Sequence, residues 1–201
     1  MLNWRVESPA PDSQLPIPRS GHRIIYFNGQ IFSFGGYNPN TENLDHLHTL
    51  LQELWKFNLI TKKWQKIELS GLVPSSTASH TAKFCVINGK AKMIVYGGTG
   101  YPFGSNSSSN IYVCDLLTGE FDILNVTYDQ AREIDRPAKL YGQAVCLVKG
   151  RYFYTVGGTT GHQYHMDVHR LDLETRTWKR LCEGRVSLEF LENTQTDPSP
   201  R

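Results

Sequence analysis

One short pattern occurs three times along this chain, always in the same order and at the same distance. In each copy an Asn or Asp is followed three residues later by Thr, and three residues after that by Trp or Phe. The copies are Asn58, Thr61 and Trp64; Asp115, Thr118 and Phe121; and Asp172, Thr175 and Trp178, so each position recurs after 57 residues. A fixed period of this length is typical of repeat architectures, in which each repeat is one supersecondary unit.

Two further signals precede each copy. A turn dipeptide lies between two apolar runs, and a glycine doublet follows the second run. The turns are Asn28-Gly29, Asn88-Gly89 and Lys149-Gly150, and the doublets are Gly35-Gly36, Gly97-Gly98 and Gly157-Gly158. Asn-Gly favours a type I′ turn, whose twist suits two antiparallel strands. We therefore expect a β-hairpin before each doublet, with the doublet ending its second strand.

Each repeat predicts four antiparallel strands, which we call a, b, c and d in chain order. Strands a and b form the hairpin, strand c leads into a turn capped by the Asx side chain, and the aromatic residue opens strand d. Such a unit, repeated about every 50 residues, is the blade of a β-propeller. We expect blades at about residues 19–67, 79–124 and 140–181, within an all-β partial propeller that covers residues 1–182.

The repeated residues have structural roles in this interpretation. Glycine in the doublets allows positive φ and close backbone approach where blades crowd together. Trp64, Phe121 and Trp178 are large enough to fill the space between neighbouring sheets. If Trp64 lies wedged between two blades, its replacement by Ala destabilises the fold by about 3–5 kcal/mol.

The two ends of the sequence extend the repeat pattern. Residues 1–7 include Trp4, which lies 60 residues before Trp64 and indicates strand d of a further blade. Residues 183–201 read as a linker or tail toward a missing blade. Since closed propellers have about four to eight blades, we expect a fragment or truncated form of a longer propeller. The alternative is that the arc pairs with a second copy.

Composition narrows the partners and the location. A formal net charge of +2 argues against nucleic acid or a membrane surface as a partner. No apolar stretch is long enough to span a bilayer, and the N-terminus shows no secretory signal. The cysteines Cys85, Cys114, Cys146 and Cys182 lack metal-binding spacing. We expect them to be free, buried thiols in a cytoplasmic protein, with the nucleus as a second location.

The repeats resemble the kelch repeat. The resemblance rests on the glycine doublets, the pair Leu54-Trp55, the spacing Asn58-x-x-Thr61-x-x-Trp64, and Arg19-Ser20-Gly21-His22 before strand a. The stretches 18–22 and 32–39 are similar to a group of kelch substrate receptors of cullin-2 RING ubiquitin ligases. That resemblance implies a pocket on one propeller face for the C-terminal tail of a target protein, often ending in glycine. It also implies an elongin/cullin-2 adaptor as partner, if the missing part carries the docking motif.

Function in such a fold lies in loops on a rigid scaffold. The b–c and d–a connections converge on one face, with b–c loops expected at 37–53, 99–109 and 159–167 and a short helix within 42–51. A peptide carboxylate needs positive charge and hydrogen-bond donors, and tyrosine offers contact area. The candidate partner-binding residues on this face are Arg19, Ser20, Tyr37, Tyr101, Arg136, Tyr141 and Tyr164. For each, ordinary loop solvation or blade packing is the competing interpretation.

Enzyme readings have less support. His46 with His48, and His162 with His165, each offer two metal ligands without a clear third. We therefore expect no catalytic residue, no metal and no cofactor. The predicted function is a protein-binding module that serves as the substrate-recognition component of a cullin-RING ligase. The alternative is a kelch scaffold in stress-kinase signalling or cytoskeletal organisation, without ubiquitin chemistry.

Overall fold

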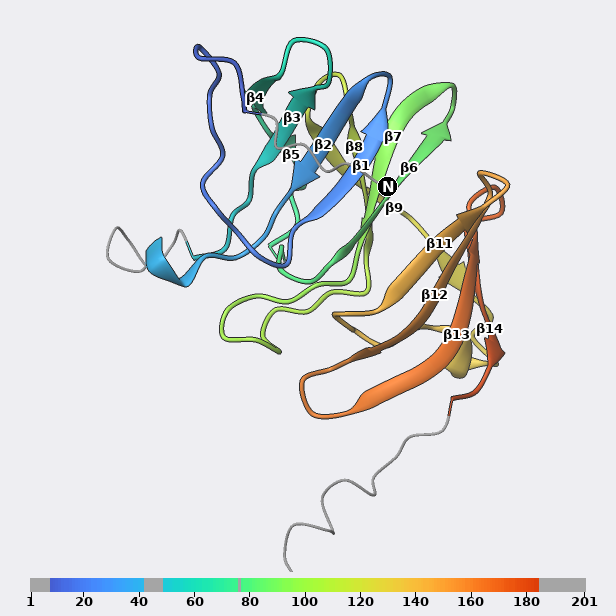
Figure 1. Ribbon diagram of the computed structural model, residues 1–201. Coiled ribbons are helices and arrows are strands. Elements are labelled where there is room, and N and C mark those ends of the chain that lie inside the picture. The colour runs from blue at the N-terminus through green and yellow to red at the C-terminus, as the bar shows by residue number, and fades with distance from the viewer. Residues whose placement is uncertain (1–7, 42–48, 76, 185–201) are drawn as a thin grey trace, which may run out of the picture.

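The computed structural model describes residues 8–41, 49–75 and 77–184, which form three sheets that follow one another in chain order (Figure 1). Blade 1 consists of β1 (Arg23–Phe27), β2 (Gln30–Phe34), β3 (Leu54–Asn58) and β4 (Lys63–Ile67). Blade 2 consists of β6 (Thr81–Ile87), β7 (Lys90–Tyr96), β8 (Ile111–Asp115) and β9 (Glu120–Leu124). Blade 3 consists of β11 (Ala144–Val148), β12 (Tyr152–Thr159), β13 (Tyr164–Asp172) and β14 (Thr177–Cys182). Within each blade, consecutive strands pair antiparallel, so the predicted all-β blades are confirmed.

The hairpin turns have the backbone conformation that their dipeptides predict. Asn28 and Gly29 have φ angles of +46° and +73°, and Lys149 and Gly150 have φ angles of +53° and +65°. Two consecutive positive φ angles define a type I′ turn. The c–d turns also repeat, because the carboxylate or amide oxygen of Asn58, Asp115 or Asp172 accepts hydrogen bonds from backbone amides two and three residues later.

The segments that lead into the blades form short pairings beside the outer strands, which the sequence pattern does not predict. The two-residue strand β5 (Ser70–Gly71) pairs parallel to β9, and β10 (Thr127–Tyr128) pairs parallel to β14. Along β4 the same place is taken by Ser13 and Gln14, which bond to the backbone amides of Trp64 and Lys66. Each outer strand is therefore partly covered by the segment that leads into its own blade, which limits edge-to-edge pairing with other molecules.

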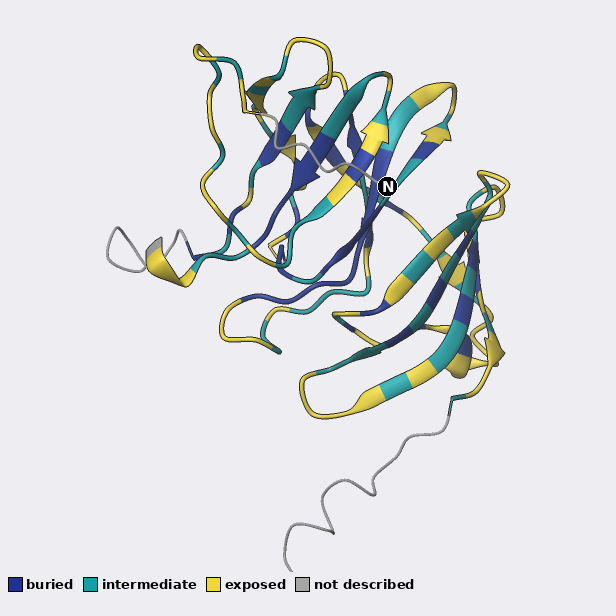
Figure 2. Cartoon of the chain, in the orientation of Figure 1, coloured by how far each residue is buried: buried dark blue, intermediate teal, exposed yellow. Residues whose placement is uncertain are grey.

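Two apolar clusters hold the blades together, one in each seam between neighbouring sheets. In the first seam Phe34 of blade 1 lies 5.0 Å from Phe121 of blade 2, measured between ring centroids. In the second, Tyr96 of blade 2 lies 5.6 Å from Trp178 of blade 3. These residues are almost fully buried, and Figure 2 shows the buried positions concentrated along the facing strands. Phe121 and Trp178 thus fill the gaps between blades, as expected.

Trp64 has a different environment from its two counterparts. It is only half-buried, and its ring packs on Phe57 of the neighbouring strand at 5.0 Å. The face of blade 1 that carries Trp64 points away from blade 2, and no described sheet covers it. The condition for the large predicted cost, a wedge between two blades, is therefore not met among the described residues.

The glycine doublets adopt one conformation in all three blades. Gly35, Gly97 and Gly157 have φ angles of +70°, +67° and +68°. A Cβ atom on Gly35 or Gly97 would lie 2.5 Å from a carbonyl oxygen of the next blade, that of Thr77 or Leu140. The glycines therefore permit the close approach of blades that was predicted.

The third doublet corrects one expectation. In blades 1 and 2 strand b ends before the doublet, at Phe34 and Tyr96, but β12 continues through Gly157 and Gly158 to Thr159. Gly158 pairs with His165 and Thr159 with Tyr164, after a register shift between Val156 and Gly158. The b–c loop of blade 3 is consequently shorter than the expected 159–167, because β13 already begins at Tyr164.

Three expected features fall wholly or partly outside the described residues. They are the N-terminal strand at residues 1–7, most of the short helix within 42–51, and the tail beyond Gly184. Thr49, Leu50 and Leu51 are not helical, and the described part of this b–c loop has only the 3₁₀ turn η1 (Pro39–Thr41).

All four cysteines are free, but only Cys85 and Cys114 are buried, and burial raises the pKa of each thiol to about 12. The expectation of burial is wrong for Cys146 and Cys182, which are exposed. Cys146 alternates with Val145 and Leu147, which face blade 2, and so points the other way.

Candidate protein-binding face

The b–c loops and the lead-ins to strand a meet at one end of the blades, which we call the loop face. In each blade, the residue three positions before strand a pairs with the residue just after the glycine doublet. The three bridges are Ser20 with Tyr37, Ala78 with Thr99, and Tyr141 with Thr159. The bases of the loops are therefore fixed in the same way in every blade, and this gives the rigid scaffold expected for a recognition surface.

An aromatic cluster joins the loops of blades 1 and 2 on this face. The ring of Tyr37 stacks on Tyr101 at a centroid distance of 5.4 Å and meets Phe103 edge-on at 5.1 Å. Tyr101 and Phe103 remain 45% and 51% exposed, so they present apolar area to solvent. Sequence reasoning placed Tyr37 and Tyr101 on one face but missed Phe103, which lies two residues after Tyr101 in the same loop.

The loops of blades 2 and 3 also touch. A Cβ atom on Gly161 would lie 3.2 Å from the Cα atom of Gly104 and 3.5 Å from the hydroxyl of Tyr141. The loop of blade 2 is closed internally, because the hydroxyl of Thr99 accepts a hydrogen bond of 2.8 Å from the amide of Gly104. Tyr141 therefore borders the same continuous surface as the aromatic cluster, whereas Tyr164 stands apart, 77% exposed at the start of β13.

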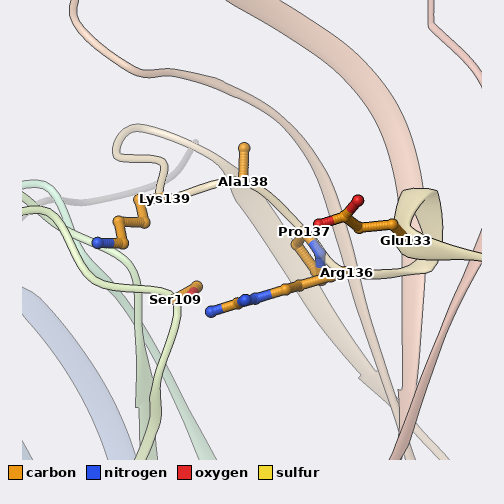
Figure 3. Close-up of a pocket in the computed structure, with 6 residues that line it drawn as sticks. All are labelled: Ser109, Glu133, Arg136, Pro137, Ala138 and Lys139. Atoms are coloured by element: carbon orange, nitrogen blue, oxygen red, sulfur yellow. The ribbon is translucent and has the colours of Figure 1, made fainter. Parts of the chain in front are cut away.

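Arg136 lies in a cavity of about 450 Å³ between blades 2 and 3 (Figure 3). The cavity is lined by Ser109, Glu133, Arg136, Pro137, Ala138 and Lys139. These residues come from the end of the b–c loop of blade 2 and from the d–a connection, which includes η3 (Glu133–Asp135). In Figure 3 the guanidinium of Arg136 extends toward Ser109, and it also lies over the ring of Tyr128 at 5.7 Å. The cavity thus offers two cations and a hydroxyl against the single carboxylate of Glu133.

Arg19 already has partners within blade 1. Its side chain is only 5% exposed, and its guanidinium donates a hydrogen bond of 2.8 Å to Glu53 and one of 3.3 Å to the carbonyl of Gly35. Burial opposes ionisation of Glu53, but hydrogen bonds from Lys66, Trp55 and Arg19 outweigh it and lower the pKa of Glu53 to about 2. Arg19 therefore ties strand a to strand c, and we leave it out of the proposed contact set. Ser20 is exposed and pairs through its backbone.

The histidines give no metal centre in the described part of the chain. His162 and His165 lie around the b–c turn of blade 3, and His46 and His48 lie outside the described residues. No group of three His, Cys, Asp or Glu side chains that could hold a metal ion occurs among residues 8–41, 49–75 and 77–184. Nor do those residues form a helix long and apolar enough to span a bilayer.

Comparison with known proteins identifies the repeat. Residues 1–188 match the model of the KLHDC2/KLHL20/DRC7 Kelch-repeats domain. The chain is 34% identical over 188 residues to kelch domain-containing protein 10 of Rattus norvegicus, and this covers 90% of the chain and 43% of the relative. It is 37% identical over 180 residues to the kelch domain-containing protein 10 homolog of Drosophila melanogaster, covering 86% of the chain and 28% of the relative.

The chain therefore spans less than half the length of these relatives. A more distant relative, leucine-zipper-like transcriptional regulator 1 of Mus musculus, is 21% identical over 179 residues. The matched range, residues 1–188, includes all three repeats. The chain belongs to the kelch-repeat family, as a run of β-propeller blades that makes a protein-binding module.

Proposed function

We propose that this kelch module holds the C-terminal tail of a target protein on its loop face. The observation that carries the proposal is the cavity of about 450 Å³ in which Arg136 and Lys139 are the cations. It lies just before Leu140 and Tyr141, where the chain enters blade 3 on the face that also bears the aromatic cluster. A cationic cavity and an exposed aromatic cluster on the same face suit a peptide that ends in a carboxylate.

The cavity would bind the terminal carboxylate, and the aromatic cluster would contact the side chains that precede it. A guanidinium can bind a carboxylate through two parallel hydrogen bonds, and Ser109 adds a hydroxyl donor. The rings of Tyr37, Tyr101 and Phe103 offer rigid area for side chains upstream of the carboxylate. Small residues at the end of the tail, such as glycine, leave room for the chain end to enter the cavity.

We further propose that the protein acts as the substrate-recognition component of a cullin-2 RING ubiquitin ligase, in the cytoplasm or nucleus. Support comes from the resemblance of residues 18–22 and 32–39 to that group of kelch receptors, and from four free cysteines, which fit a reducing location. The second candidate is a kelch scaffold in stress-kinase signalling or cytoskeletal organisation, favoured by the same loop face if it binds partners without an adaptor.

Peptide binding tests the first proposal. A panel of peptides ending in glycine is made in two forms, with a free C-terminal carboxylate and with an amide, and titrated against the protein by fluorescence anisotropy. We expect binding of the carboxylate form alone, and a loss of about tenfold to hundredfold in R136A, since hydrogen bonds to charged groups contribute about 1.5–3 kcal/mol. R176A, which removes an exposed cation from the opposite end of blade 3, is the matched control and leaves binding unchanged. Equal affinity of the two forms would rule out carboxylate recognition.

Affinity purification separates the two cellular roles. The tagged protein, expressed from its complete coding sequence, is recovered from cells and its partners are identified. Recovery of elongin and cullin-2 supports the receptor. Recovery of kinases or cytoskeletal proteins without them supports the scaffold.

A further inference from the structure

The end of the blades opposite the loop face is built from the a–b hairpins and the c–d turns, and we call it the turn face. It comprises residues 27–30, 59–63, 87–90, 116–120, 148–151 and 173–177. In each blade the two turns are joined by one backbone hydrogen bond. The donors are the amides of Leu59, Leu116 and Leu173, and the acceptors are the carbonyls of Gly29, Ala91 and Arg151. Each c–d turn is therefore tied to the a–b hairpin of its own blade.

Large apolar side chains stand exposed on this face. Ile60 and Leu117 occupy the same position in the c–d turns of blades 1 and 2, and they are 87% and 84% exposed. Blade 3 has Glu174 at this position, with its side chain 67% exposed. The c–d turn therefore also forms around a charged residue, so its conformation does not require an apolar side chain at this position. Leu117 also lines a cavity, so its exposed side chain adjoins further apolar area instead of standing alone on the surface.

A cavity of about 460 Å³ opens beside Leu117, in the seam between blades 1 and 2. Its lining is Phe27, Asn28, Gly89, Lys90, Ala91, Asp115, Leu117 and Thr118. Phe27 is held in place by a stacked contact with Phe84 at 4.8 Å, and Asp115 is held by an ion pair with Lys92 at 3.0 Å. Phe27, Ala91 and Leu117 give the cavity an apolar wall, with exposed Lys90 at its border. This volume and lining suit one or two apolar side chains of a partner.

The charge on the turn face points to an acidic partner. Its basic residues are Lys62, Lys63, Lys90, Lys149, Arg151 and Arg176, and its acidic residues are Glu120 and Glu174. Lys63 pairs with Asp12, Arg151 pairs with Asp172 and Glu174, and Lys92 pairs with Asp115 at the cavity. With these partners counted, seven basic residues stand against five acidic ones, so the net charge of this end remains positive. The basic residues are spread over three blades and the whole chain carries only +2, which is too little for a nucleic-acid surface. A spread positive charge around an apolar cavity fits an acidic protein segment.

We propose that the turn face is a second docking surface, on which an acidic protein segment inserts an apolar side chain between blades 1 and 2, beside Lys90. This site is independent of the tail-binding site, because the two surfaces lie at opposite ends of the strands (Figure 1). One molecule can then hold a target on one face and a second protein on the other.

Peptide display tests this proposal without involving binding at the tail site. A library of random peptides, displayed internally so that none has a free C-terminus, is selected against the whole protein. Enriched peptides are then titrated against the wild type, L117D and K90E. The matched control is Y164D, which places the same charge at an exposed aromatic residue on the opposite end of blade 3. Thermal melting checks that all variants fold, as their exposed positions lead us to expect.

We expect the enriched peptides to contain an apolar residue flanked by Asp or Glu. Their affinity should fall about tenfold or more in L117D and K90E and stay unchanged in Y164D. Absence of enrichment, or full binding by L117D, overturns the proposal. The proposal is also overturned if the protein binds phosphatidylserine vesicles or single-stranded RNA more tightly than the enriched peptides, and if K90E abolishes that binding. The surface would then serve a membrane or a nucleic acid.

Discussion

At the scale of single residues, one position at the start of strand a shows how neighbouring blades are joined. It is occupied by His22, His80 and Gln143 in blades 1, 2 and 3. His80 is fully buried, and its Nδ1 lies 3.0 Å from the carbonyl oxygen of Thr77. Gln143 donates its side-chain amide across the seam to the carbonyl of Tyr96, at 3.2 Å. Both side chains serve the packing of strand a at the crowded inner rim.

His80 makes the stability of the protein depend on pH. Burial lowers the pKa of His80 from 6.5 to about 3, so the side chain is neutral in the folded protein. Between these two pH values the unfolded chain binds more protons, and stability falls as the pH drops, by up to about 1.4 kcal/mol per pH unit. In H80Q, which places the residue of blade 3 in blade 2, this contribution disappears. Urea unfolding near neutral pH and near pH 5 should show a smaller acid loss for H80Q, and an equal loss would contradict the assignment.

A second prediction at this scale compares two glycines with the same backbone conformation. Gly97 and Gly89 have φ angles of +67° and +72°. A Cβ atom on Gly97 would collide with the side chain of Gln143, whereas one on Gly89 has no atom within 4 Å. We expect G89A to cost about 1 kcal/mol for the left-handed backbone, and G97A about 3–5 kcal/mol because a clash between blades is added. Denaturant unfolding measures both, and similar costs would show that the blades are not in close contact at Gly97.

At the scale of elements, the sequence predicts what is local and misses what is tertiary. The a–b hairpins and c–d turns follow from Asn-Gly and Asx-x-x-Thr, because those residues determine the turn by themselves. The short strands β5 and β10 were not foreseen, since each has two residues and forms only by pairing with the outer strand of the blade that follows it, about 50 residues later in the chain. Likewise, the extension of β12 and β13 past Gly157 depends on cross-strand pairing, which a glycine doublet alone does not reveal.

The aromatic residues of strand d give a prediction for the elements. Trp178 is 3% exposed between Tyr96 and Phe153, and Trp64 is half-buried against Phe57. W178A should destabilise the protein by about 3–5 kcal/mol, the usual cost of removing a buried large aromatic, and W64A by clearly less. Urea unfolding compares the two variants. An equal cost would mean that Trp64 is also covered by a second sheet.

At the scale of the whole molecule, the three blades form a scaffold whose two ends present different surfaces. The face that carries the loops was predictable, because strand alternation sends every b–c and d–a connection to one end. The composition of the site was only partly predictable. Arg19 forms an ion pair with Glu53, 34 residues away, and the residues around Arg19 in the sequence do not indicate this partner. Phe103 joins Tyr37 only because the loops of two blades meet.

Hydrogen–deuterium exchange of the protein, with and without a saturating peptide that ends in a free carboxylate, tests the central claim most directly. The claim is that a rigid stack of blades binds a protein tail through its loop face. We predict slower exchange in residues 99–106 and 136–141, with the strands of all three blades unchanged. Protection confined to the a–b hairpins and c–d turns, or spread evenly through the strands, would contradict it.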